Sequence, residues 1–374
     1  MSTLIPFDHQ PRTRLVFGNG TLSRVGELVR EYGGSRVLVV SDPGIVTAGY
    51  TERASGFLRE AGLAVEIFGQ VRENPSTEDV DACVAVAREF GADFIIGLGG
   101  GSSMDTAKGC NFILTNGGRI HDYWGTGKAT KPMLPIIAIP TTAGTGSECQ
   151  SYALISDADT HVKMACGDPK AAAKAAILDP ELTVSQPRRV TVCTGIDAIS
   201  HALETAVTKK RNALSMLYSR EGFRLCHAGF PRVLRNPKDT EARGMMLLGA
   251  AYAGIAIENS MLGAAHSCAN PLTALFHVTH GDAVGVMLPH VIRFNAAQPE
   301  IAAIYESYFD GDLADRVSEL LWEAQMPRTI TEHGVKLENL RDLAEMAAKQ
   351  WTAQFNPRLP SVEDFVELYR AALG

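Results

Sequence analysis

The sequence predicts an α/β N-terminal domain followed by an all-helical C-terminal domain. Up to about residue 180, short continuous apolar runs alternate with segments of helical spacing, a pattern typical of a parallel sheet covered by helices. Beyond about residue 185, helical patterns continue almost to the end of the chain without a convincing strand. A chain of 374 residues also exceeds the size at which one hydrophobic core usually stops growing. We therefore expect two domains, residues 1–185 and 186–374.

The elements of the first domain follow from apolar runs and the turns that bound them. Residues 36–40 form one such run, which ends at a Ser-Asp-Pro turn, and residues 94–98 form another before three glycines. Runs of this kind are typical of strands buried on both faces. In chain order we expect strands at 14–18, 36–40, 64–71, 94–98, 133–140, 150–156, 161–167 and 176–180, and helices at 22–32, 47–61, 77–90 and after the three glycines. The strands at 150–156 and 161–167 are expected to form a hairpin.

The second domain is expected to contain helices only. Apolar residues recur there at helical spacing over long stretches. The expected helices are 190–209, 212–235, 239–257, 260–275, 283–296, 300–324, 337–353 and 361–372. The change of pattern places the domain boundary within 183–188.

Composition and charge exclude several functional classes. The net charge of -7 leaves no basic excess to neutralise phosphates, which argues against a general nucleic-acid or membrane-surface binder. No run approaches the roughly 20 apolar residues that span a bilayer, and residues 1–14 lack the apolar core of a secretory signal. Seven cysteines without a C-x-x-C pair are typical of free thiols in a reducing compartment. We expect a cytoplasmic protein without a nucleic-acid or membrane partner.

A glycine-rich stretch follows the apolar run at 94–98. Gly99, Gly100 and Gly101 are followed by Ser102 and Asp105, an S-x-x-D arrangement that predicts a capped helix start. Glycines at the positive end of a helix let backbone amides approach a ligand closely, and a pyrophosphate suits such a place. The stretch matches neither G-x-G-x-x-G nor G-x-x-x-x-G-K-[ST]. On these residues alone, a simple tight turn is an equally good interpretation.

Small hydroxyl and glycine residues also follow the strand expected at 133–140. Residues 141–148 read Thr-Thr-Ala-Gly-Thr-Gly-Ser-Glu and include Thr141, Thr142 and Ser147. In open α/β sheets, ligands collect beyond the carboxyl ends of the strands. The stretch therefore places hydrogen-bond donors at the expected ligand edge of the sheet.

A carboxylate and three histidines of the second domain suggest a metal site. Asp197 and His201 are four residues apart, so on a helix they leave the same face one turn apart. His266 and His280 lie in a second apolar, Gly-rich stretch. One carboxylate and three imidazoles suit a divalent ion such as Fe(II) or Zn(II). Taken singly, each histidine is more often a satisfied core residue, and only a structure can show whether the four converge.

Several long motifs in this order resemble the iron-containing (group III) alcohol dehydrogenases, in the superfamily that also holds glycerol dehydrogenase and dehydroquinate synthase. The resemblance extends from Phe17-Gly18 to Asn356-Pro357-Arg358. Its specific parts are Gly99 to Lys108, Pro140 to Glu148, Gly195 to Glu204, Gly263-x-x-His266, His280-Gly281 and Leu288-Pro289-His290. It implies a dehydroquinate-synthase-like fold, with an α/β NAD-binding domain, an all-α metal-binding domain and a homo-oligomer, a dimer or larger.

The resemblance also implies a role for individual residues. The metal ligands would be Asp197, His201, His266 and His280, holding Fe(II), with Zn(II) as the other choice. The residues implied for NAD binding are Asp42, Asn74, Gly100, Gly101, Ser102, Asp105, Thr141, Thr142, Ser147 and Lys163, with Asp105 bracing the glycine loop. A carboxylate at Asp42 would accept from a ribose hydroxyl and repel a 2′-phosphate, so NAD(H) is expected rather than NADP(H).

One position departs from the family pattern. Many members carry a second histidine four residues after the ligand that corresponds to His266, and here that position is Asn270. His277 is the expected substitute as a catalytic polar group near the substrate, unless it simply faces solvent. The departure bears on the proton path and the substrate class more than on the metal.

The expected activity is a metal-dependent, NAD(H)-linked interconversion of a small primary or secondary alcohol, or a diol, with its aldehyde or ketone. A glycerol-dehydrogenase-like zinc polyol dehydrogenase is the nearest alternative. A dehydroquinate-synthase-like lyase is disfavoured, because that chemistry needs more phosphate-binding basic residues than the motifs provide. An NAD-binding protein without catalytic activity is the remaining alternative, and the intact ligand positions argue against it.

Overall fold

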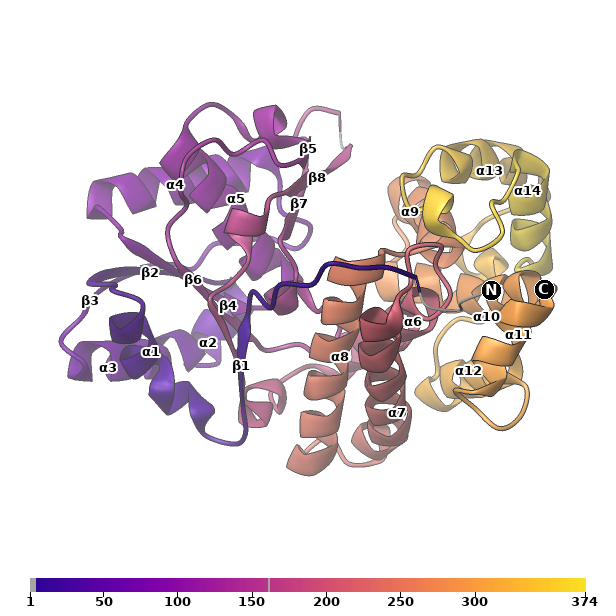
Figure 1. Ribbon diagram of the computed structural model, residues 1–374, viewed down its shortest axis with the longest axis horizontal. Coiled ribbons are helices and arrows are strands. Elements are labelled where there is room, and N and C mark those ends of the chain that lie inside the picture. The colour runs from indigo at the N-terminus through magenta and orange to yellow at the C-terminus, as the bar shows by residue number, and fades with distance from the viewer. Residues whose placement is uncertain (1–4, 161) are drawn as a thin grey trace. The chain divides into compact units, whose positions relative to one another are not determined.

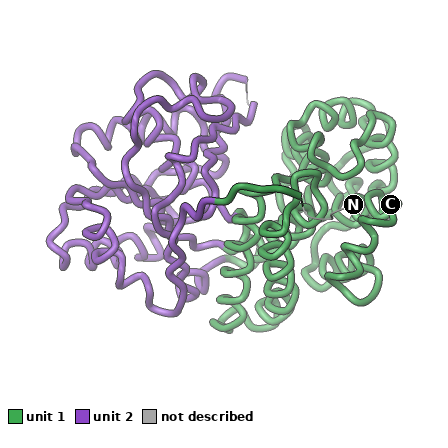
Figure 2. The backbone as a smooth tube through the Cα atoms, in the orientation of Figure 1, with its two compact units in different colours: residues 1–9, 143–145, 187–374 green, residues 10–142, 146–186 purple. Residues whose placement is uncertain are grey.

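The computed structural model describes residues 5–160 and 162–374 (Figure 1). The chain divides into two compact units (Figure 2). The α/β unit consists of residues 10–142 and 146–186, and the helical unit consists of residues 187–374 together with 143–145 and the described residues before 10. The single domain boundary expected from the sequence does not account for two short segments, residues 143–145 and the described residues before 10, which belong to the helical unit. Residue 161, at the start of the expected hairpin strand, lies outside the described residues.

A six-stranded parallel sheet forms the centre of the α/β unit. Its strand order is β1-β9-β6-β4-β2-β3, and every neighbouring pair is parallel. The strands are β1 (Arg14–Phe17), β2 (Arg36–Val40), β3 (Ala64–Phe68), β4 (Phe94–Gly99), β6 (Ile136–Pro140) and β9 (Ala175–Leu178). All residues of β4, β6 and β9 are buried, which explains their continuous apolar sequences.

Helices cover both faces of this sheet. They are α1 (Val25–Glu31), α2 (Pro43–Thr47), α3 (Tyr50–Glu60), α4 (Thr77–Phe90) and α5 (Gly101–Asn116). Alternate residues of β2 belong to different cores: Leu38 packs with α4 and α5, whereas Val39 packs with α1 and α3. The helix expected at 47–61 is α3, which begins after Gly49, at φ 79°. The short helix α2 before it, capped by the carboxylate of Asp42, was not predicted.

A small second sheet lies in the same unit. The hairpin strands β7 (Tyr152–Ser156) and β8 (Lys163–Gly167) pair in antiparallel fashion, as the sequence predicts. The two-residue strand β5 (Gly125–Thr126) adds to β8 in parallel and was not predicted, because two residues carry no readable periodicity.

The helical unit contains nine α-helices within the described residues. They are α6 (Arg188–Thr205), α7 (Ala213–Arg235), α8 (Thr240–Ser260), α9 (Ala264–Phe276), α10 (His280–Ala296), α11 (Pro299–Glu306), α12 (Leu313–Ala324), α13 (Leu340–Ala348) and α14 (Val362–Ala371). No strand occurs in the described part of this unit. Two helices, α11 and α12, replace the single helix expected at 300–324. The break occurs because Gly311 adopts φ 135° and Asp312 caps the start of α12. Helix α10 begins three residues before the expected start and includes His280.

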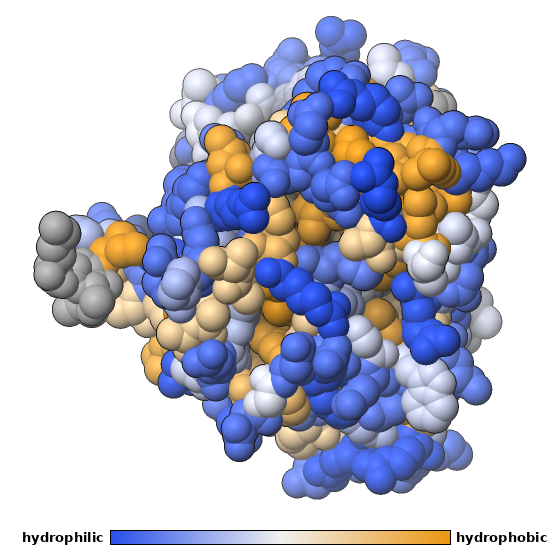
Figure 3. All heavy atoms as spheres, turned by 90° about the vertical axis from the view of Figure 1, so that its right-hand side faces the viewer, coloured by the Kyte–Doolittle hydropathy of each residue, from blue (hydrophilic) through white to orange (hydrophobic). Residues whose placement is uncertain are grey.

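The surface of the helical unit shown in Figure 3 is largely hydrophilic, with apolar side chains visible between charged ones. Two shallow hollows lie along α14, and none of the residues predicted for a site lines either of them. One hollow contains the ion pair of Arg341 with Glu363, at 2.7 Å. Among the residues that the structure describes, no single helix is long and apolar enough to cross a membrane; α8 and α9 reach that composition only together, and they are bent by 104°.

Candidate functional site

One buried face of α6 carries three polar side chains. Asp197, His201 and Glu204 are spaced four and three residues apart, so they lie on one side of the helix. They are 5%, 5% and 3% exposed, although α6 is otherwise built mainly from small and apolar residues. Burying charged and polar groups is costly unless each has a partner, which makes this face a candidate site.

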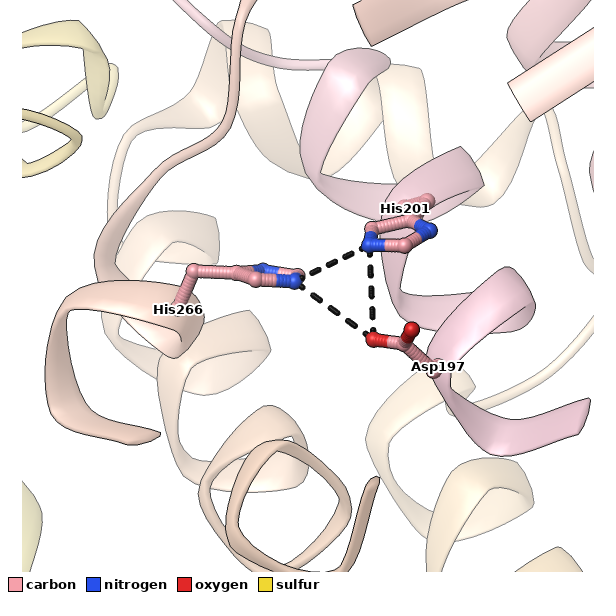
Figure 4. A group of neighbouring side chains, drawn as sticks. All are labelled: Asp197, His201 and His266. Atoms are coloured by element: carbon pink, nitrogen blue, oxygen red, sulfur yellow. Dashed lines mark hydrogen bonds and ion pairs between the residues drawn. The ribbon is translucent and has the colours of Figure 1, made fainter. Parts of the chain in front are cut away.

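Asp197 and His201 meet His266 of α9 (Figure 4). The distance from Asp197 Oδ1 to His201 Nε2 is 3.3 Å, and to His266 Nε2 it is 3.5 Å. The two Nε2 atoms are 3.1 Å apart. The three ligand atoms thus lie within 4.8 Å of one another, as a single metal ion requires.

His280 joins this group from the first residue of α10. Its Nε2 lies 3.8 Å from Asp197 Oδ1, and its ring centroid lies 5.3 Å from that of His266. Its side chain is 34% exposed, unlike the three buried members of the group. The structure therefore brings together all four side chains that the resemblance assigns to a metal.

The hydrogen bonds of the two buried imidazoles fit a bound cation. In the neutral form, His201 donates from Nδ1 to the carbonyl of Gly144 at 3.2 Å, and His266 donates from Nδ1 to Glu204 Oε2 at 2.5 Å. Both rings then direct an Nε2 lone pair toward Asp197 Oδ1, which is buried and accepts no hydrogen bond. Two lone pairs and a carboxylate oxygen this close repel one another unless a positive charge lies between them. This donor set suits Fe(II) or Zn(II).

The electrostatics of the cluster favour a positive charge at its centre. Burial opposes ionisation of Asp197, but the three surrounding imidazoles outweigh burial and hold its pKa below the ordinary range. Burial lowers the pKa of His201. Burial acts in the same sense on His266, yet the carboxylates of Glu204 and Asp197 raise its pKa to about 9. A proton or a metal ion is therefore strongly attracted to this place.

Sequence reasoning missed two partners of the cluster. Glu204 was not assigned a role, although an acidic residue seven positions after Asp197 on a buried helix is a readable signal. The carbonyl of Gly144 carries no sequence signal, because any residue provides one. The tight approach of residue 144 to α6 does require glycine, since a Cβ there would lie 2.5 Å from Thr194 Cβ.

In the α/β unit, Asp42 and the glycine loop meet where the strand order reverses. After β2 the chain pairs β3 on one side, and β4 then lies on the other side. Such a switch point is where open α/β sheets bind ligands. A Cβ on Gly99, at φ 152°, would lie 2.4 Å from Ser103 Oγ and 3.0 Å from Asp42 Oδ2. Only glycine therefore fits between β4 and α5.

The expected S-x-x-D cap at the start of α5 is wrong. Gly100 is the N-cap, α5 begins at Gly101, and no side chain caps this turn. Ser102 therefore lies within the first turn rather than before it. Uncapped amides beside glycines suit an anion such as a pyrophosphate.

Asp105 braces a different loop from the one expected. Its Oδ1 accepts from Ser147 Oγ at 2.9 Å, so it stabilises the loop after β6 rather than the glycine loop. Burial raises the pKa of Asp105, and the ammonium groups of Lys108 and Lys163 act in the opposite sense. Lys163 Nζ also donates to the exposed Asn74 at 3.3 Å. Asp105, Lys108, Lys163 and Asn74 thus form one polar group with Ser147.

Lys108 was not predicted as a site residue. It is 1% exposed, and its Nζ donates to the carbonyl of Ser147 at 2.7 Å, to Ser147 Oγ at 2.8 Å and to the carbonyl of Tyr152 at 3.0 Å. A lysine inside an otherwise buried helix was the available signal. Its hydrogen bonds fix the loop at 146–152 against α5.

Thr141 and Thr142 lie beside the glycine loop. The amide of Thr141 donates to the carbonyl of Gly99 at 2.9 Å. A Cβ on Gly100 would lie 3.4 Å from Thr142 Cγ2. The structure therefore brings both threonines next to the loop where the resemblance places a dinucleotide.

His277 lies apart from these buried groups. It ends α9 in the left-handed region, at φ 54°, and its side chain is exposed. Asn270, one turn after His266, donates to Gln350 Oε1 at 2.9 Å and so ties α9 to the segment after α13. The role of His277 stays a prediction.

The burial of Glu148 predicts that the stability of the folded protein depends on pH. It is 1% exposed, its Oε1 has no hydrogen-bond partner, and burial raises its pKa to about 7. The folded protein then holds this proton more tightly than the unfolded chain, whose carboxyl has a pKa of about 4.3. Its contribution to stability is therefore greatest below about pH 4, declines as the pH rises to about 7, and is absent above that.

We expect Glu148→Gln to raise the free energy of unfolding relative to the parent at pH 8, by up to about 3 kcal/mol, and to have little effect near pH 4.5. Urea unfolding of both proteins at the two pH values measures this. An equal difference at both pH values would mean that folding does not raise the pKa of this carboxyl.

Comparison with known proteins matches both halves of the chain to one family. A family model described as iron-containing alcohol dehydrogenase matches residues 11–180, and one described as the C-terminal part of the Fe-containing alcohol dehydrogenase family matches residues 191–373. The NAD-dependent methanol dehydrogenase of Bacillus methanolicus is 35% identical, over 96% of this chain and 97% of its own length.

Solved structures give the same result for the fold. A 1,3-propanediol oxidoreductase aligns with a TM-score of 0.93 at 32% identity, covering 99% of this chain and 100% of its own. Sulfoacetaldehyde reductase from Bifidobacterium kashiwanohense, solved with NAD+, aligns with a TM-score of 0.89 at 27% identity, covering 98% and 99%. The fold class and enzyme class predicted from sequence are confirmed, and this chain belongs to the iron-containing alcohol dehydrogenase family.

Proposed function

We propose that the protein is an NAD(H)-linked dehydrogenase that interconverts a small primary or secondary alcohol, or a diol, with its aldehyde or ketone. The observation that carries this proposal is the buried group of Asp197, His201 and His266, whose three ligand atoms face one another. A buried carboxylate oxygen without a hydrogen-bond donor, beside two imidazole lone pairs, is explained by a cation.

Asp197, His201, His266 and His280 would hold Fe(II), or Zn(II) in its place. A bound ion of this kind supplies Lewis-acid polarisation of the substrate oxygen, and NAD(H) supplies or accepts the hydride. The three buried side chains set the position of the ion. His280 is the most exposed member of the set, so it is the side chain through which the cluster would be open to solvent.

The α/β unit would bind NAD(H) at its switch point. The amides beside Gly100, Gly101 and Ser102 suit the pyrophosphate, while Thr141 and Thr142 offer hydroxyl groups beside them. Asp105 and Ser147 would hold each other in place through their hydrogen bond. The hydrogen-bonded pair of Lys163 and Asn74 would add further polar contacts. Asp42 stands at the end of β2, where its charge would repel a 2′-phosphate.

His277 is proposed to exchange the substrate proton with solvent. Its exposed imidazole lies three residues before His280, and an imidazole ring nitrogen can either accept or donate a proton. A general acid or base of this kind contributes typically 10²–10⁴-fold to a rate, roughly. The role rests on position along the chain and on the absence of a histidine at position 270.

The substrate is proposed to be a short alcohol or diol. The relatives described above are a methanol dehydrogenase, a 1,3-propanediol oxidoreductase and a sulfoacetaldehyde reductase, all of which act on small molecules. The seven cysteines are all buried, and an odd number of them without a C-x-x-C pair fits a reducing, cytoplasmic compartment. A homo-oligomer, a dimer or larger, is expected from the family resemblance.

Protein purified without oxygen tests the function. Its metal content is measured, and NADH oxidation is then followed with short aldehydes and ketones after loading with Fe(II) or Zn(II). We expect turnover with at least one of them, and faster turnover with NADH than with NADPH. Tight NADH binding without turnover on any substrate would favour a non-catalytic NAD-binding protein.

The Asp42→Asn variant tests cofactor choice in the same assay. Asparagine keeps the side-chain oxygen that accepts from the amides of Gly44 and Ile45, at 2.9 and 3.1 Å, so the cap of α2 is preserved. The charge is lost, together with the acceptor of the 3.4 Å hydrogen bond that Ser103 Oγ donates to Asp42 Oδ2. We expect the preference for NADH over NADPH to fall about tenfold or more, which corresponds to roughly 1.4 kcal/mol; an unchanged ratio would remove Asp42 from cofactor selection.

A further inference from the structure

Glu204 joins two helices of the candidate metal cluster through both oxygens of one carboxylate. Its Oε2 accepts from His266 Nδ1 at 2.5 Å, and its Oε1 accepts from the amide of Ala265 at 2.6 Å. Glu204 is 3% exposed, so both hydrogen bonds lie in a nearly dry environment. One side chain of α6 therefore fixes both the ring of His266 and the turn of α9 that carries it.

The start of α9 has no cap of its own. Its N-cap is Gly263, which has no side chain, and the first amides are satisfied by residues distant in sequence. Asn356 Oδ1 accepts from the amide of Ala264 at 3.1 Å, while Glu204 accepts from Ala265. A Cβ on Gly263 would lie 2.8 Å from Asn356 Oδ1 and 3.1 Å from Glu204 Oε1. Glycine is required there because these two oxygens occupy the space of a side chain.

We propose that Glu204 is a positioning residue, which holds His266 in the tautomer that offers Nε2 to a divalent ion. The proposal rests on the metal site described under the proposed function. A carboxylate oxygen at Nδ1 can only accept a hydrogen bond, so the neutral ring, which is the form that binds a metal ion, carries its proton on Nδ1 and keeps a lone pair on Nε2. The second oxygen fixes the backbone of α9, so the ring cannot move away without breaking the cap.

The chemistry of this position requires two acceptors. Glutamine has one oxygen and one NH₂ group in the same shape. If its oxygen faces Ala265, its NH₂ group faces Nδ1 and drives the proton of His266 to Nε2, where it opposes a cation. If its oxygen faces His266, its NH₂ group meets the amide of Ala265, and two donors are left in conflict. Neither arrangement preserves both contacts.

The test measures affinity for Zn(II) by competition with a chromophoric chelator, which needs no turnover. We expect Glu204→Gln to bind Zn(II) about 10–100-fold more weakly than the parent, the usual effect of losing a hydrogen-bond partner of a ligating histidine. The d–d absorption of bound Co(II) should also shift, because the orientation of one ligand changes. Unchanged affinity within threefold, together with an unchanged spectrum, would overturn the proposal.

Ser267→Ala provides the matched control. Ser267 lies next to His266 on α9, and its hydroxyl bonds the carbonyl of Gly263 at 2.9 Å and Thr352 Oγ1 at 2.7 Å. Its removal loosens the same turn of α9 but leaves the bond between Glu204 and Nδ1 intact. We expect the metal-free Ser267→Ala protein to melt at a lower temperature while it binds Zn(II) within threefold of the parent. A loss of affinity equal to that of Glu204→Gln would assign the effect to the stability of α9 and overturn the positioning role.

A second variant keeps the test decisive if glutamine prevents folding. Glu204→Asp retains both acceptors on a side chain shorter by one methylene, so it should bind Zn(II) with an affinity between those of the parent and a protein without the carboxylate. Affinity and a Co(II) spectrum equal to those of the parent would again overturn the proposal. A parent protein that binds neither Zn(II) nor Co(II) would instead overturn the proposed metal site itself, which separates the two failures.

Discussion

Replacing Asp197 by alanine is expected to abolish turnover while NADH binding persists. Asp197 Oδ1 is the atom shared by the contacts to all three imidazoles, so its loss removes the negative centre that attracts a cation. Lewis-acid polarisation is worth several kcal/mol in the transition state, which is about a thousandfold or more in rate. The residues proposed for NAD binding belong to the α/β unit, and the substitution does not touch them. Metal content, kcat and the quenching of NADH fluorescence measure the three consequences.

An exposed aspartate of the same unit provides the control. Asp342 lies in the first turn of α13 with its side chain in solvent, so Asp342→Ala should change neither metal content nor kcat. Parent-like turnover by metal-stripped Asp197→Ala would refute the metal mechanism. A loss of NADH binding in the same variant would show that the substitution had disturbed more than the cluster.

Replacing Gly281 by alanine is expected to destabilise the helical unit strongly and to weaken metal binding. A Cβ at this position would lie 2.3 Å from the carbonyl oxygen of Cys193 and 2.7 Å from its Cα. These are backbone atoms of α6, so no side chain can rotate to make room. Helix α10 would have to move away from α6 and carry the adjacent His280 with it. Overpacking typically costs about 1–3 kcal/mol and more where backbone must move, so we expect a loss of about 3 kcal/mol.

Thermal unfolding of the metal-free protein and Zn(II) affinity measure the two effects of Gly281→Ala. Gly56 of α3 provides the matched control, because a Cβ there meets nothing within 4 Å. Gly56→Ala should stabilise the protein by up to about 1 kcal/mol, since glycine is unfavourable within a helix. If both glycine variants unfold at the parent temperature, α10 and α6 are not in the close contact described above.

Local sequence information was enough for most of the secondary structure. Helix α4 occupies the expected residues 77–90, because Ser76 and Asp79 form a capping box and Gly91 ends the helix in the left-handed region. Strands β2 and β4 follow from apolar runs that are buried on both faces. The four-residue spacing of Asp197 and His201 was likewise sufficient to place both on one face of α6.

The errors arose where single side chains decide how a helix begins. The S-x-x-D pattern predicted a cap on α5, but Asp105 is held by Ser147, forty-two positions along the chain. The short helix α2 was not predicted before the helix expected at 47–61; the carboxylate of Asp42 begins it, and Gly49 separates it from α3. The start of neither α5 nor α2 can be recognised from hydrophobic periodicity, because capping depends on single side chains.

The sequence by itself determined the fold class, the family and the face of α6 that carries Asp197 and His201. Only the tertiary structure decided that His266 and His280 converge on Asp197 Oδ1, and that Glu204 and the carbonyl of Gly144 hold the two buried imidazoles. The physical reason is one of range: periodicity and capping act between residues a few positions apart, whereas a metal cluster is made by the packing of three helices. The spacing of these residues along the chain therefore indicated a candidate metal site, and the packing of α6, α9 and α10 brings its four side chains together.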